Sequence, residues 1–164
     1  MKKTLIFFSM ILVFLAGCKK QETRIIDYYP INIGFQVVDA NGNDMLDPSN
    51  SNNILGDVQI QYNGTAYSCK VPSKAYMESF NGLTLSNEKY GSPALYVMNL
   101  GEFSPIGDYR NKTFSIDFGD GTGTHTVEFT FYVSKKNAMN VIHEFKFNGE
   151  TNTTNMPIFK YTIH

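Results

Sequence analysis

The side chains with the clearest capacity for chemistry lie in one polar segment, DANGNDMLDPSNSNN, at residues 39–53. Carboxylate and amide oxygens of this kind are the ligands that Ca²⁺ takes in sets of six to eight. The candidate calcium ligands are Asp39, Asn41, Asn43 and Asp47, with Asp44 beside them. Asn, Asp and Gly are also the residues that form turns, so we favour an exposed connection that holds no metal. Calcium is the alternative.

A second acidic pair, Asp117 and Asp120, lies in the segment DFGDGTG. Two carboxylates that face each other across a glycosidic bond are the machinery of glycosidases. The glycines at residues 119–123 indicate a turn, however, and Asp is a turn-forming residue, so we assign both carboxylates to turn formation. Neither Gly-x-Ser-x-Gly nor a phosphate-binding glycine loop occurs in the chain. We therefore expect a protein that is not an enzyme.

The remaining metal-binding and nucleophilic side chains are scattered along the chain. The three histidines, His125, His143 and His164, lack the spacing of metal ligands. His143 alternates with Val141 and Phe145 and is expected to face the core or its edge. In TAYSCKV, Cys69 shares a strand face with Tyr67 and Val71, so the alternation predicts a buried, unreactive thiol.

The first cysteine, Cys18, lies in a different context, the leader MKKTLIFFSMILVFLAGC. Lys2 and Lys3 precede an apolar run of eleven residues, 5–15, which is about half of the ~20 that a membrane-spanning helix needs. The segment Leu-Ala-Gly-Cys at residues 15–18 resembles the lipobox of bacterial lipoproteins, including those of Bacteroidota. The resemblance implies that residues 1–17 are a signal peptide and that Cys18 carries the lipid and becomes the first residue of the mature chain.

The residues after Cys18 suit a lipid-anchored protein. Residues 18–30 are polar, end at a proline, and read as a tether between the lipidated cysteine and a domain at residues 31–164. Acyl chains contribute about 0.8 kcal/mol per buried methylene, which holds a protein on a bilayer without a spanning segment. Lys19 resembles the residue that follows the cysteine in lipoproteins sent to the outer membrane. Whether the domain faces the periplasm or the cell exterior stays open.

The composition predicts a single β-rich domain, and the charge predicts that nucleic acid is not its partner. The chain has 164 residues with ten Tyr and thirteen Phe, and only 18% of the residues are charged. Removal of Lys2 and Lys3 with the leader changes the formal net charge from −1 to −3 (−1 − 2), which disfavours nucleic acid as a partner.

Alternation of apolar and polar residues with period two recurs from residue 31 to the end, whereas no segment shows helical spacing over three turns. Asn63-Gly64 predicts a tight two-residue hairpin, and residues 73–80 have room for one helical turn. The strands expected from this pattern are residues 31–37, 58–62, 65–71, 83–85, 94–100, 114–118, 127–133, 141–147 and 159–163.

Eight or nine strands of this kind predict an all-β fold, a two-sheet antiparallel β-sandwich, because one open sheet would leave an aromatic face in water. Residues 33–65 are similar to the opening hairpin of carboxypeptidase-regulatory-like and transthyretin-like sandwiches, an alternative to an immunoglobulin-like sandwich. The matching positions are Asp39, Gly42, Gly56, Val58, Ile60 and Gly64.

These patterns predict a membrane-anchored envelope lipoprotein that acts as a non-enzymatic binding or assembly module for a protein or glycan partner. The alternative is a lipoprotein that binds carbohydrate or another small ligand for nutrient uptake, with or without calcium. Surface tyrosines suit sugar stacking, although Trp, the more usual residue for that contact, is absent.

Overall fold

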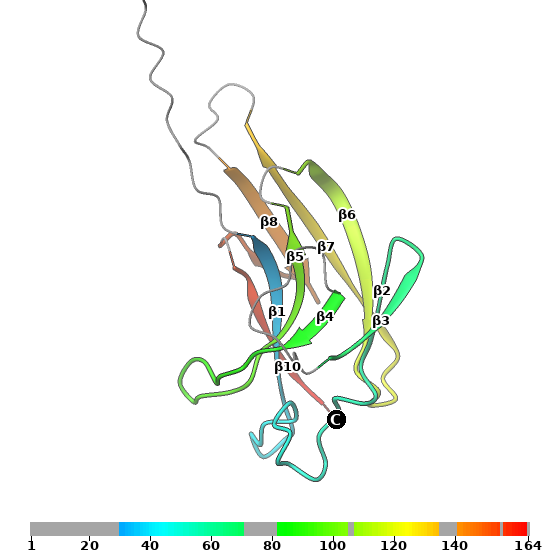
Figure 1. Ribbon diagram of the computed structural model, residues 1–164, viewed down its shortest axis with the longest axis vertical. Coiled ribbons are helices and arrows are strands. Elements are labelled where there is room, and N and C mark those ends of the chain that lie inside the picture. The colour runs from blue at the N-terminus through cyan, green and yellow to red at the C-terminus, as the bar shows by residue number, and fades with distance from the viewer. Residues whose placement is uncertain (1–29, 71–81, 105–106, 135–140, 155, 164) are drawn as a thin grey trace, which may run out of the picture.

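The computed structural model describes residues 30–70, 82–104, 107–134, 141–154 and 156–163 (Figure 1). The leader, Cys18 and all of the expected tether except residue 30 lie outside these residues, as does the helical turn expected at 73–80. Among the described residues, no helix is long and apolar enough to cross a membrane.

The described residues contain ten strands, which form two sheets. The four-stranded sheet has the order β10-β1-β5-β4, and the six-stranded sheet has the order β3-β2-β6-β7-β8-β9. The strands are β1 (Ile31–Val38), β2 (Gln59–Tyr62), β3 (Thr65–Ser68), β4 (Gly82–Leu85), β5 (Met98–Phe103), β6 (Tyr109–Asp117), β7 (Thr124–Val133), β8 (Val141–Phe147), β9 (Glu150–Asn152) and β10 (Ile158–Thr162).

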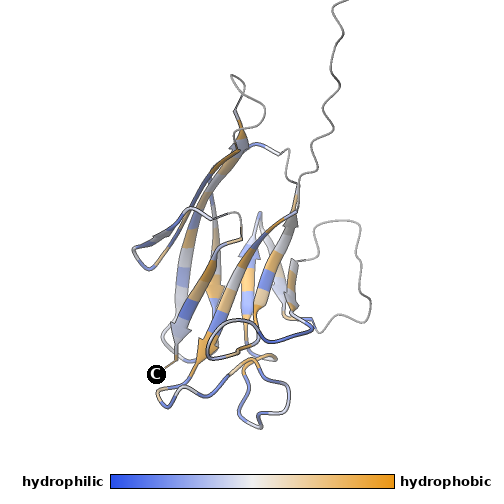
Figure 2. Cartoon of the chain, turned by 90° about the vertical axis from the view of Figure 1, so that its left-hand side faces the viewer, coloured by the Kyte–Doolittle hydropathy of each residue, from blue (hydrophilic) through white to orange (hydrophobic). Residues whose placement is uncertain are grey.

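The two sheets pack face to face as an all-β sandwich, which confirms the predicted fold class. Orange and blue alternate along the strands in Figure 2, as expected when one face of each strand is buried. One pairing departs from the antiparallel expectation, because β10 runs parallel to β1 over residues 158–162. The chain reaches this parallel position by crossing from β9, in the other sheet, to the edge of the four-stranded sheet.

Aromatic rings fill the space between the sheets around Phe35, a fully buried residue of β1. Its ring centroid lies 5.4 Å from Phe147, 6.0 Å from Phe118 and 6.3 Å from Phe114, which all belong to the opposite sheet or its turns. Phe159 of β10, the strand next to β1 in the same sheet, lies 6.0 Å from Phe35. Rings at these separations add edge-to-face attraction to the burial of apolar area, so Phe35 links the two sheets.

The sequence pattern predicts most strand positions but not all strand bounds. The Asn63-Gly64 hairpin is confirmed, since both residues have positive φ and Tyr62 pairs with Thr65. The apolar run 94–100 begins before its strand, because β5 starts at Met98 and extends to Phe103. The short strand β9 was not expected. β1 and β2, which the transthyretin-like resemblance places in one hairpin, lie in different sheets.

The chain enters the sandwich at one end and places its longest described polar loop at the other. In Figure 1, β1 starts at the top, whereas the loop at residues 39–57 and the end of β10 lie at the bottom. Ile163 N donates a hydrogen bond to Val38 O, 2.9 Å away, which joins the end of β10 to the point where this loop begins. The loop therefore lies at the end of the domain opposite to the point where the chain enters.

Candidate functional site

The polar loop at residues 39–53 is folded by its own carboxylates. Asp39 accepts hydrogen bonds from Asn43 Nδ2 (2.7 Å), from the backbone N–H of Asn43 (2.8 Å) and from that of Asn41 (2.9 Å). These bonds, with those from Asn43 first, hold the pKa of Asp39 below its usual value. Asp39 and Asn43 therefore close a turn, as the favoured interpretation of the sequence predicts.

Asp44 and Asp47 tie this loop to the segment before β5. Asp44 accepts from the backbone N–H of Leu46 at 2.9 Å and from that of Tyr96 at 2.8 Å. Lys89 Nζ lies 2.7 Å from Asp47 Oδ2, and this bond, followed by those from Ser49, lowers the pKa of Asp47 to about 2. The Lys89 ammonium also lies 5.2 Å from the centroid of the Tyr96 ring.

These two segments line a hollow of about 490 Å³, which we call the loop hollow. Within the residues that the structure describes, no group of three or more His, Cys, Asp or Glu side chains is placed to hold a metal. The Lys89 ammonium donates to Asp47 Oδ2 and so occupies a position that a metal ion bound to Asp47 would need. The calcium hypothesis stays a prediction. The residues that line the loop hollow are Asp39, Asn43, Asp44, Met45, Asp47, Ser49, Asn50, Asn52 and Lys89.

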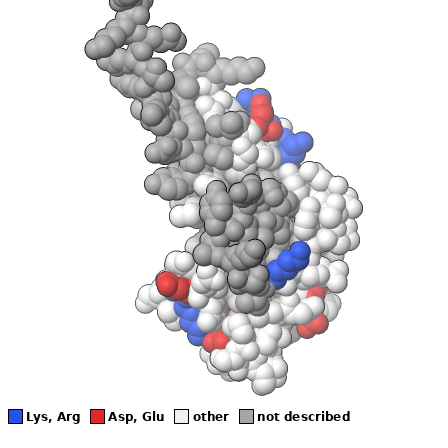
Figure 3. Space-filling view, in the orientation of Figure 1, with Lys and Arg blue, Asp and Glu red and all other residues white. Residues whose placement is uncertain are grey.

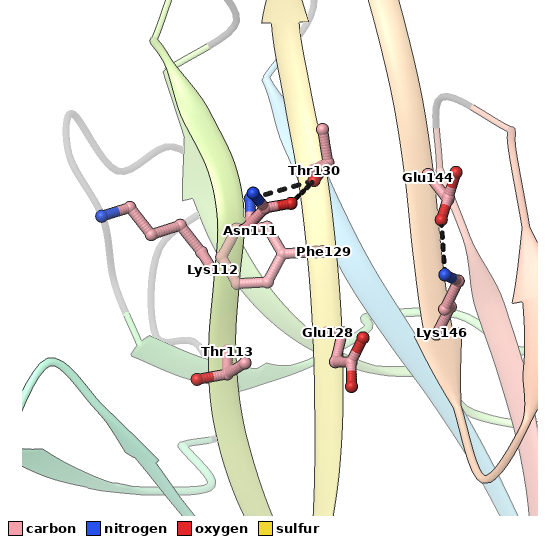
Figure 4. Close-up of a pocket in the computed structure, with 8 residues that line it drawn as sticks. All are labelled: Asn111, Lys112, Thr113, Glu128, Phe129, Thr130, Glu144 and Lys146. Carbon is pink, nitrogen blue, oxygen red and sulfur yellow. Dashed lines mark hydrogen bonds and ion pairs between the residues drawn. The ribbon is translucent and has the colours of Figure 1, made fainter.

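A second hollow, of about 330 Å³, lies on β6, β7 and β8, and we call it the sheet groove (Figure 4). Antiparallel pairing sets its side chains in rows, because Thr113 is opposite Glu128 and Glu128 is opposite Lys146. Thr130 opposite Glu144 begins the next row. The residues that line the sheet groove are Asn111, Lys112, Thr113, Glu128, Phe129, Thr130, Glu144 and Lys146.

A β-bulge shapes the sheet groove on the β6 side. The register between β6 and β7 shifts between Tyr109 and Lys112, and Asn111 adopts a φ of 50°. The backbone N–H of Asn111 donates to Thr130 Oγ1 at 3.0 Å. Bulges re-aim side chains and interrupt the flat surface of a sheet. Here the bulge turns the Asn111 side chain toward Thr130, as Figure 4 shows.

The two hollows differ in how many of their polar side chains are already bonded. In the sheet groove, Glu144 and Lys146 form an ion pair at 2.7 Å. Within the described residues, the side chains of Lys112, Thr113 and Glu128 make no hydrogen bond or ion pair, whereas all three carboxylates of the loop hollow do. The sheet groove therefore keeps donors and acceptors available for a ligand. The sequence gives no signal for it, because its polar residues are ordinary exposed or half-buried positions of three strands and Phe129 belongs to the core.

Space-filling Figure 3 shows how charge is distributed on the face that Figure 1 presents. Lys, Arg, Asp and Glu side chains lie there in small groups, some of mixed sign, among mostly uncharged atoms. Arg110 and Asp108 form an ion pair, with Nη1 and Oδ2 2.6 Å apart. The guanidinium of Arg110 also lies 3.9 Å from the centre of the Tyr132 ring, so this outward aromatic is already covered.

Asp117 and Asp120 both serve the turn between β6 and β7. Asp117 accepts from the backbone N–H of Gly119 at 2.9 Å. Asp120 accepts from Thr122 Oγ1 at 2.6 Å and from the Tyr161 hydroxyl at 2.8 Å. These hydrogen bonds outweigh desolvation and lower the pKa of Asp120, whereas an acid catalyst needs a raised pKa.

The structure also brings His125 to this turn, which the sequence analysis missed. His125 Nε2 lies 3.3 Å from Thr122 Oγ1, and Nδ1 lies 3.2 Å from Asn148 Oδ1. The contact joins the β6–β7 turn to the β8–β9 turn. The only signal for this contact in the sequence is the order of the strands. When successive strands pair antiparallel, every second turn lies at the same end of the sheet, so the β6–β7 and β8–β9 turns are neighbours.

Two other residues singled out in the sequence, Cys69 and His143, are half-buried in the structure. β3 ends at Ser68, so Cys69 lies just after the strand and not on its face, and it is half-buried against the core where the sequence predicts a buried thiol. Burial raises the pKa of this thiol to about 11. His143 is half-buried, with its ring stacked 6.4 Å from Phe145, and desolvation lowers its pKa. His143 therefore lies at the edge of the core.

Comparison with known proteins finds no relative of this chain. No family model, no curated protein and no solved structure matches the chain.

Proposed function

We propose that this protein is a bacterial envelope lipoprotein that acts as a non-enzymatic binding module, held at the outer membrane by acyl chains on Cys18. The observation that carries the proposal is the leader with its Leu-Ala-Gly-Cys end, followed by a sandwich that needs no membrane-binding surface of its own. The partner is a protein or a glycan.

The arrangement of the domain supports this role. β1 begins at one end of the sandwich, and the polar loop at residues 39–53 lies at the opposite end (Figure 1). A chain anchored ahead of β1 would therefore direct this loop away from the lipid and leave the sheet groove exposed along the side. Both surfaces are rigidly supported, one by the Asp44 and Asp47 bonds and the other by three paired strands.

The anchor is tested by expressing the wild-type chain and the Cys18→Ala variant in a Gram-negative bacterium supplied with labelled palmitate. We expect label in the wild-type protein, which sediments with outer membranes, and no label in the variant. Cys69→Ala is the matched control and should be labelled like the wild type. Equal labelling of wild type and Cys18→Ala would overturn the proposal.

A further inference from the structure

The sheet groove carries four charged side chains whose charges cancel. Lys112 and Lys146 are cationic, and Glu128 and Glu144 are anionic. A phosphate, a carboxylate or an ammonium ligand would therefore meet as much repulsion as attraction along this surface. The loop hollow differs, since three Asp carboxylates face one Lys ammonium. Charge in the sheet groove favours a neutral ligand.

The sheet groove is also unsuited to an apolar ligand. Its one apolar lining residue is Phe129, whose side chain is only 2% exposed because it belongs to the core. The other lining side chains are hydroxyls, carboxylates, ammonium groups and one amide, and these alternate between donors and acceptors across the strands. A ligand that fits must both donate and accept hydrogen bonds at many closely spaced positions.

A sugar has this chemistry, because each hydroxyl both donates and accepts. Glu128 is positioned to accept from one or two hydroxyls, and Thr113, directly opposite it on β6, to donate or accept. The Lys112 ammonium points away from β7 and β8 (Figure 4). Adjacent strands lie about 4.8 Å apart, so the three strands offer polar groups at repeated intervals along a line across the sheet. A chain of sugar units can follow such a line.

We infer that the sheet groove on β6, β7 and β8 binds a neutral oligosaccharide without calcium, an inference that rests on the proposed role as a binding module. Glu128 is its main acceptor, because it is exposed and forms no ion pair within the described residues, since Lys146, directly opposite it on β8, is paired with Glu144. The bulge at Asn111, fixed by Thr130, holds the β6 side of the groove in place before the ligand arrives.

The inference is tested with the mature lipoprotein in detergent micelles, by calorimetric titration with neutral hexasaccharides: maltohexaose, cellohexaose, xylohexaose and mannohexaose. We expect at least one to bind, and we expect Glu128→Ala to weaken its affinity at least about tenfold, as loss of a charged hydrogen-bond partner does. Lys89→Met, in the loop hollow, is the matched control and should bind like the wild type. EDTA should not change the affinity.

Two results would overturn the inference: no heat with any of the four hexasaccharides, or binding that Lys89→Met abolishes while Glu128→Ala leaves it unchanged. Circular dichroism of each variant checks that the fold is retained. Failure here is separate from failure of the anchor, because palmitate labelling of Cys18 and sugar binding by Glu128 are measured independently.

Discussion

The carboxylates of the 39–53 loop already have hydrogen-bond partners within the protein. Asp39, Asp44 and Asp47 each accept at least two hydrogen bonds, and those bonds come from the loop itself, from Tyr96 N–H and from Lys89. Metal binding would have to replace these bonds. The sequence shows the oxygens, but it does not show that Lys89, far away in the chain, neutralises one of them.

Titration of Asp47 tests this arrangement. The pKa of Asp47 is about 2 in the folded protein, below the ordinary value of 3.8. The stabilisation from its bonds is therefore present above pH 3.8 and is lost as the pH falls through about 2. We expect the carboxyl ¹³C shift of Asp47 to titrate near pH 2 in the wild type and at a higher pH in Lys89→Met, still below the ordinary value because the bonds from Ser49 remain. An unchanged midpoint in Lys89→Met would contradict the assigned cause.

Thiol labelling tests the environment of Cys69. Because burial raises its pKa to about 11, almost no thiolate is present at pH 8. We expect a disulfide reagent to label Cys69 of the folded Cys18→Ala chain much more slowly than the same chain in denaturant. Equal rates would show that Cys69 is accessible and ionised in the folded protein.

At the level of elements, alternation predicts most strands because strands such as β2, β7 and β10 bury one face and expose the other. Residues such as Ile31, Ile33, Phe35 and Val37 are buried as their spacing indicates. Alternation does not reveal partners, however. Nothing in residues 158–162 indicates that β10 pairs parallel with β1, because that pairing depends on the chain crossing between sheets after β9.

The candidate site was less predictable than the fold, for a physical reason. The sheet groove depends on which outward side chains face each other across strands, and a register shift at Asn111 alters that arrangement. Glu128, Glu144 and Lys146 look like ordinary solvent-facing positions until their register is known. The loop at residues 39–53 was the opposite case, since its polar residues are adjacent in sequence and its turns could be predicted.

Substitution of Phe35 tests how the sheets hold together. Phe35→Ala should lower the free energy of unfolding by about 3–5 kcal/mol, because it removes a buried ring and leaves a cavity between the sheets. Met156→Ala is the control, since Met156 is 64% exposed, and should change stability by no more than about 0.5 kcal/mol. Urea denaturation measures both. Similar losses for the two variants would contradict the assigned core.

For the whole molecule, we predict that thermal stability does not depend on a bound metal. With Asp47 bound to Lys89, the loop has its own cation. We expect the same melting temperature in EDTA and in millimolar calcium, measured by circular dichroism. A melting temperature that rises when calcium is added to the wild type, but not when it is added to Asp39→Asn, would support the alternative calcium site. The residues of that site are Asp39, Asn41, Asn43 and Asp47.

The central claim is that lipid on Cys18 replaces a membrane-spanning segment. Mass spectrometry of the N-terminal peptide from the natural membrane-extracted protein tests this most directly. We predict a chain that begins at Cys18, with a diacylglyceryl group on the sulfur and an acyl group on the amine. A peptide that retains residues 1–17, or a Cys18 with a free thiol, would contradict it.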